Sequence, residues 1–220
     1  MSGSRPVPDT WSQTPSQTPS QTPSQTVGPF FHYALTETPG DDLDPDRHAG
    51  RPVVIRGRVL DGQGAPVGDA MLEVWQADGG GRYRHPADGR APDVPDGFVG
   101  FGRIATEASS GRFEVHTAMP GTVPGRDGGV QAPHLNVHVF ARGLLRHLHT
   151  RIYFEDGPGN DQDPVLASVP AERRATLLAR RDATASDATA TDAAATDVDA
   201  VAYRFDLVLQ GADETVFFEA

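Results

Sequence analysis

The chain has 220 residues, which fits one domain with additional low-complexity segments. Its net charge of −11 argues against a nucleic-acid partner, because phosphate binding requires clustered basic residues. No cysteine is present, so disulfides and thiolate catalysis are excluded and a cytoplasmic location is expected. No apolar run reaches the roughly 18 residues of a membrane helix, and no signal-peptide core is found, so neither membrane insertion nor export is expected.

Two segments have a composition that predicts disorder. Residues 1–26 are dominated by a Ser-Gln-Thr-Pro repeat that runs from Ser12 to Thr26 and contains too few apolar side chains to form a core. Residues 183–200 form a second low-complexity insertion of Ala, Thr and Asp. We therefore expect one folded domain over residues 27–220, interrupted by this insertion.

The folded part has the composition of a loop-rich all-β domain, with 24 glycines and 19 prolines. Alternating apolar residues predict strands over 51–60 and 65–76, joined as a hairpin by the turn Asp61–Gly64. A second strand pair is predicted over 101–106 and 111–117.

The C-terminal part contains one helical pattern and further alternating runs. These predict a short helix over 170–181, then strands over 201–209 and 214–219. Seven or eight short strands with one short helix indicate a β-sandwich.

Four of the eight histidines lie between Ala132 and Phe154. This stretch contains two alternating runs, which predict two strands joined by a short loop at Arg142-Gly143. Histidines at alternate positions of a strand share one side, so a metal site is one hypothesis. The other hypothesis, which the spacing alone favours, is that these histidines belong to the polar faces of sandwich strands.

Eight short sequence motifs, taken together, resemble a known family. They occur in this order: Thr26–Phe30, Gly57–Gly64, Leu72–Asp78, Gly81–His85, Phe101–Arg103, Ala132–Asn136, Arg151–Phe154 and Ala202–Asp206. They closely resemble the intradiol ring-cleavage dioxygenases over Pro23 to Glu219, apart from the Ala/Thr/Asp insertion. The resemblance implies a prealbumin-like β-sandwich and an oxidoreductase that cleaves a small aromatic substrate with non-haem Fe(III) and O2.

Within the family, the Thr-Pro-Ser-Gln-Thr-x-Gly-Pro start and the phrase Phe140–Gly143 are most similar to one group of α chains. These chains belong to two-chain enzymes that convert protocatechuate to 3-carboxy-cis,cis-muconate in the β-ketoadipate pathway of aromatic catabolism. The resemblance thus implies a β chain as the partner of this chain.

The departures from the family pattern concern iron. The iron-bearing chains supply two tyrosines and two histidines, a donor set that suits the hard Fe(III) ion. Tyr83 and His134 match one residue of each type, but Val123 and Asn136 stand at the other two positions. Gln131 stands where the iron-bearing chains have a catalytic arginine. The resemblance therefore implies that this chain ligates no metal, that Tyr83 and His134 are remnants, and that Fe(III) is bound by the partner β chain.

The resemblance also assigns pocket residues. Thr26, Gly28, Pro29 and Phe30 would cross the interface and wall the substrate pocket of the β chain. Arg142 would reach the same region and offset the carboxylate of protocatechuate, which makes it the candidate catalytic residue.

Two alternatives stay open at this level. One is a single-chain catechol-type dioxygenase with its own iron, which would need His138 to replace the missing histidine. The other is a non-catalytic binding sandwich of transthyretin-like shape.

Overall fold

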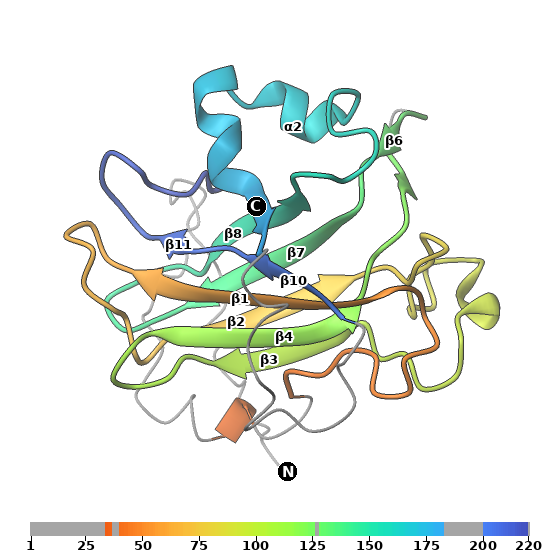
Figure 1. Ribbon diagram of the computed structural model, residues 1–220, viewed down its shortest axis with the longest axis horizontal. Coiled ribbons are helices and arrows are strands. Elements are labelled where there is room, and N and C mark those ends of the chain that lie inside the picture. Colours follow the sequence, from red (N-terminus) through yellow and green to blue (C-terminus); the bar gives the residue numbers. More distant parts are fainter. Residues whose placement is uncertain (1–33, 37–39, 126–127, 183–199, 220) are drawn as a thin grey trace, which may run out of the picture.

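The computed structural model describes residues 34–36, 40–125, 128–182 and 200–219. Two layers of strands pack face to face (Figure 1). The first layer contains β1 (Pro52–Leu60), β4 (Arg112–Ala118), β10 (Val201–Arg204) and β11 (Leu207–Val208). The second contains β2 (Met71–Gln76), β3 (Phe101–Ala105), β7 (His134–Phe140) and β8 (Leu148–Phe154). The strand β9 (Leu178–Arg181) pairs with both β8 and β10 and so joins the layers at one edge.

Short elements complete the fold. They are β5 (Val123–Pro124), which pairs with β6 (Val130–Gln131), the α-helix α2 (Pro164–Ser168), and the 3-10 helices η1 (Ala91–Asp93) and η2 (Ala171–Leu177). The helix α2 lies beyond the edge of β7 and β8, at the top of Figure 1. No helix in the described ranges is both long and apolar enough to cross a membrane.

Alternate residues of the strands form the core. Val53 and Ile55 of β1 face Leu72 and Val74 of β2 in one buried apolar cluster. Leu135, Val137 and Val139 of β7 belong to the same cluster and are fully buried. Because successive side chains of a strand point to opposite faces, the residues between them lie on the outer side of the sheet. The predicted all-β sandwich is confirmed.

The predicted hairpin partners were wrong. β1 pairs with β4, β10 and β11, whereas β2 pairs with β3 and β7, so the two predicted hairpins each connect one layer to the other. The two connections pack together instead. Ala70 N donates to Thr106 Oγ1 over 3.0 Å, and a Cβ on Gly68 would lie 2.0 Å from the Ala108 carbonyl oxygen. Alternation identifies a strand but carries no information about which strand lies beside it.

The C-terminal predictions also need correction. Residues 170–181 contain the 3-10 helix η2 followed by the strand β9, and the α-helix lies earlier, at α2. The predicted strand over 201–209 is broken between β10 and β11, where Asp206 accepts from the Arg58 backbone N–H at 3.0 Å. Residues 214–219 form only an isolated bridge, from Phe218 to His149. The N-terminal repeat and nearly all of the Ala/Thr/Asp insertion lie outside the described residues.

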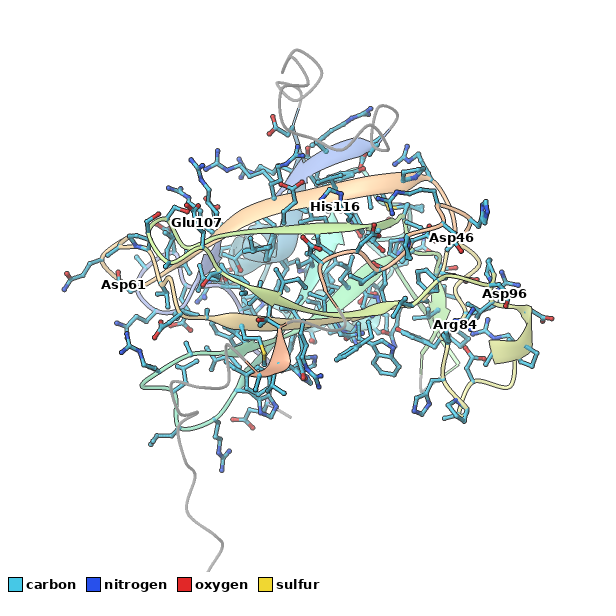
Figure 2. The ribbon with its side chains drawn as sticks, turned by 90° about the horizontal axis from the view of Figure 1, so that it is seen from below. Asp46, Asp61, Arg84, Asp96, Glu107 and His116 are labelled. Carbon is cyan, nitrogen blue, oxygen red and sulfur yellow. The ribbon has the colours of Figure 1, made fainter. Side chains whose placement is uncertain are left out.

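The loops gather at the two ends of the sandwich. Figure 2 shows Asp61 and Glu107 at one end, and Asp46, Arg84 and Asp96 at the opposite end. Arg84 directly follows Tyr83, so Tyr83 belongs to this second end.

Candidate functional site

The strands β7 and β8 form the predicted antiparallel pair. His134 lies opposite Tyr153, Asn136 opposite Arg151, and His138 opposite His149. These residues alternate with the core residues of both strands, so they line the outer face of the sheet. The two histidine-bearing runs therefore do share one side, as the alternation predicted.

Tyr83 is held over this face by a tight loop. Asp78, which is fully buried, accepts from the backbone N–H groups of Gly80 and Arg82, each at 2.9 Å. Gly81 has a φ of +73°, and a Cβ there would lie 1.9 Å from the Thr122 carbonyl oxygen, so only glycine fits. The Tyr83 ring comes to rest 4.7 Å from the Trp75 ring.

His134 is a buried, neutral imidazole. Its side chain is 3% exposed, and Nδ1 donates to the Ala132 carbonyl oxygen over 2.7 Å. Burial and the positive charge of Arg151 lower the pKa of His134 to about 4. The ring lies 5.6 Å from that of Tyr153.

Val123 and Asn136 occupy the two positions at which the family resemblance implies the other iron ligands. Val123 is buried and lies opposite Gln131 in the β5–β6 pair. The Asn136 side chain forms a hydrogen bond with Tyr83. Burial raises the pKa of Tyr83, and the charge of Arg151 and this hydrogen bond only partly oppose the rise. Tyr83 is therefore a neutral phenol at neutral pH. We call Tyr83, Val123, His134 and Asn136 the degenerate site.

The degenerate site does not fit Fe(III). It offers one phenol and one imidazole, while the Asn136 amide is a weak donor and Val123 has no donor atom. The guanidinium of Arg151 adds a positive charge that acts on both Tyr83 and His134. Among the described residues, no group of three or more His, Asp or Glu side chains is arranged to hold a metal ion.

Three residues of this end had no role assigned from the sequence. Arg151 Nη1 donates to Gln131 Oε1 over 2.8 Å and to the Tyr153 hydroxyl over 3.2 Å. The Tyr153 hydroxyl donates to Asp163 Oδ1 over 3.2 Å. Asp163 also caps α2 by accepting from Val165 N and Leu166 N. An Asp directly before a proline is a signal of a helix N-terminus, so Asp163-Pro164 could have revealed this cap.

His138 belongs to a separate cluster of histidine rings, formed with His147 and His149. Its ring lies 4.8 Å from that of His147 and 5.0 Å from that of His149. Burial and the charge of His147 lower the pKa of His138, while Glu73 opposes the shift. Since its ring packs against these histidines on the far side of Asn136 from His134, His138 does not complete the degenerate site.

Arg142 lies at the opposite end of β7, in the loop that leads to β8. Its Nε donates to Asp69 Oδ2 in an ion pair, and its side chain is 70% exposed. The seven residues of β7 span about 20 Å at ~3.3 Å per residue, so Arg142 is far from the degenerate site. The other four predicted pocket residues, Thr26, Gly28, Pro29 and Phe30, lie outside the described residues.

The fold and the degenerate site define a class, that of β-sandwich ring-cleaving dioxygenases. The sequence pattern of a family described as "Dioxygenase" matches residues 27–211. The solved hydroxyquinol 1,2-dioxygenase of Pseudomonas putida DLL-E4 superimposes with a TM-score of 0.57 at 28% identity, covering 86% of this chain and 67% of that chain. The chain belongs to the intradiol ring-cleavage dioxygenase family.

Both chain types of one two-chain enzyme are among the relatives. The chain is 45% identical over 204 residues to the protocatechuate 3,4-dioxygenase α chain of Burkholderia cepacia, covering 88% of this chain and 94% of that one. It is 32% identical over 191 residues to the β chain from the same organism, covering 86% of this chain and 75% of that one.

Proposed function

We propose that this chain is the α subunit of a protocatechuate 3,4-dioxygenase. In this assignment it pairs with a β chain that holds Fe(III), and together they open 3,4-dihydroxybenzoate with O2 to give 3-carboxy-cis,cis-muconate. The chain itself binds and orients the substrate and supplies no ligand to the metal. The near full-length similarity to an α chain supports the assignment.

One observation supports the proposal: the two ends of β7 carry different side-chain chemistry. At one end the donor set of the degenerate site does not fit Fe(III), and at the other end Arg142 is exposed. An arginine side chain cannot cover the ~20 Å between these ends, which is the length of β7. If Arg142 acts on a substrate, the reacting centre therefore belongs to another chain.

The role of Arg142 in this proposal follows from the chemistry of the substrate. Protocatechuate differs from catechol by one carboxylate, and a guanidinium can bind a carboxylate with two parallel hydrogen bonds. Arg142 follows Ala141 in a loop, where a side chain can project past the edge of the sheet. Its partner in the structure, Asp69, is itself a carboxylate and binds the guanidinium as the substrate carboxylate would.

The experiment is steady-state kinetics of the Arg142→Ala α chain reconstituted with a wild-type β chain. We expect KM for protocatechuate to rise about 10-fold or more, since a lost charge-assisted hydrogen bond is worth about 1.5–3 kcal/mol. Turnover of catechol, which has no carboxylate, should change far less.

Arg146→Ala is the matched control, because Arg146 is an exposed arginine of the same loop. It should leave KM for protocatechuate close to that of the wild type. Equal losses of Arg142→Ala on both substrates would point to assembly, and no loss on either would remove Arg142 from the substrate pocket.

A further inference from the structure

Arg151 has an unusual position for a positive charge. It lies in β8, opposite Asn136, on the outer face that also carries His134. Both hydrogen bonds of its Nη1, to Gln131 and to Tyr153, are made to neutral oxygen atoms. Among the described residues, no carboxylate lies within ion-pair distance of Arg151. The carboxylate nearest to it along this series of hydrogen bonds is that of Asp163, which accepts from the Tyr153 hydroxyl.

The neighbours of this guanidinium belong to the segments that carry all four positions of the degenerate site. Asn136 is its cross-strand neighbour and forms the hydrogen bond with Tyr83. Gln131, which accepts from Arg151, is the strand partner of Val123. Tyr153, the other acceptor, packs against His134. Arg151 thus connects the segments around Tyr83, Val123, His134 and Asn136, as a shared metal ion would connect its ligands.

We propose that Arg151 is the resident cation of the degenerate site: it takes the place of a metal ion in holding these segments together and keeps Fe(III) out. The physical reason is that a metal ion and a guanidinium at contact distance repel each other in a half-buried site. The loss of iron in this chain therefore has two causes, the missing donors at Val123 and Asn136 and the added charge at Arg151. This inference stands whether or not Arg142 serves the partner's substrate pocket.

The test restores the donors with and without the charge. The double variant Val123→Tyr/Asn136→His recreates two tyrosines and two histidines in the full-length chain. The triple variant adds Arg151→Gln, which retains a hydrogen-bond donor but removes the charge. Fe(III) binding to the purified chain is measured by equilibrium dialysis with metal analysis, and by the visible charge-transfer band of an Fe(III)-phenolate.

We expect the triple variant to bind Fe(III) about a hundredfold more tightly than the double variant, as one unit charge at close range permits. Arg151→Lys in place of Arg151→Gln should leave the double variant's weak binding unchanged, because the charge remains. Arg103→Gln is the matched control: Arg103 is an arginine of the same sheet that already pairs with Glu73, and its loss should not improve iron binding.

Two results would overturn the proposal. Tight Fe(III) binding by the double variant would show that Arg151 does not exclude metal, and equally weak binding by the double and triple variants would show that its charge is not what keeps iron out. Thermal unfolding of Arg151→Gln in the otherwise natural chain gives a second measurement that does not depend on the rebuilt donors. Its melting temperature should fall more than that of Arg103→Gln, and an unchanged value would contradict the holding role.

Discussion

The two ends of the β7–β8 hairpin differ in almost every physical respect. At the end that begins with His134, the side chains of His134, Tyr153 and Asp163 are buried, and each is hydrogen-bonded within the chain. At the end that carries Arg142, the side chain is exposed and its partner is a surface aspartate. Both ends share one pair of strands, with continuous register from His134–Tyr153 to Val139–Leu148.

This difference indicates how a duplicated enzyme chain can change its role while its fold stays the same. The strands hold the backbone at both ends, so side chains at either end can change while the fold stays the same. The exposed end carries a charge that is paired with Asp69 but remains open to solvent. We therefore expect changes at the exposed end and in the N-terminal arm to alter kinetics, and changes at the buried end to alter stability.

The largest effect is expected from the N-terminal arm, residues 23–31, which the family resemblance places in the same pocket as Arg142. Deleting residues 1–22 should leave the activity of the reconstituted enzyme near normal. Deleting residues 1–31 should abolish it, because this change also removes Thr26, Gly28, Pro29 and Phe30, which the family resemblance implies line the substrate pocket of the β chain. The measurement is protocatechuate turnover with a wild-type β chain. Equal effects of the two deletions would show that residues 23–31 do not contribute to the active site.

At the buried end, Asp163→Ala should destabilise the chain strongly. Asp163 is fully buried and accepts from Ala132 N, Val165 N, Leu166 N and the Tyr153 hydroxyl. Leaving these donors without a partner should lower the free energy of unfolding by about 3 kcal/mol or more, measured by urea denaturation. Asp161→Ala, at an exposed position nearby, is the control and should cost little. Equal stability of the two variants would contradict a stabilising role for the hydrogen bonds of Asp163.

A smaller, pH-dependent effect is expected from His134. Its pKa is about 4 in the folded chain against an ordinary value of about 6.5, so the unfolded chain binds its proton first as the pH falls. The resulting stability is present above pH 6.5 and is lost between about 6.5 and 4, by up to about 3 kcal/mol. His149 also has a pKa of about 4, so comparing His134→Gln with the natural chain isolates the contribution of His134 to the pH dependence of the free energy of unfolding. Identical slopes of unfolding free energy against pH in the two proteins would refute the assignment.

Much of the fold could be predicted from the sequence, because the period of two in Val53–Val59 and Leu135–Val139 depends only on which face is buried. The pairing of β1 with β4 could not, since it depends on the connections that cross between layers. The degenerate site was predicted from the four residue types at the family positions. The contacts of Arg151 to Gln131 and Tyr153 could not be predicted, because they depend on the β7–β8 register and on the β5–β6 pair.

The most direct test of the central claim is the iron content of the chain alone and in complex with its β chain. Because Val123 and Asn136 replace two donors and Arg151 adds a charge, the purified chain should contain no stoichiometric iron and show no phenolate-to-iron charge-transfer colour. The complex with the β chain should be coloured, contain iron and cleave protocatechuate. A coloured, iron-containing chain that cleaves the substrate without a partner would contradict the account.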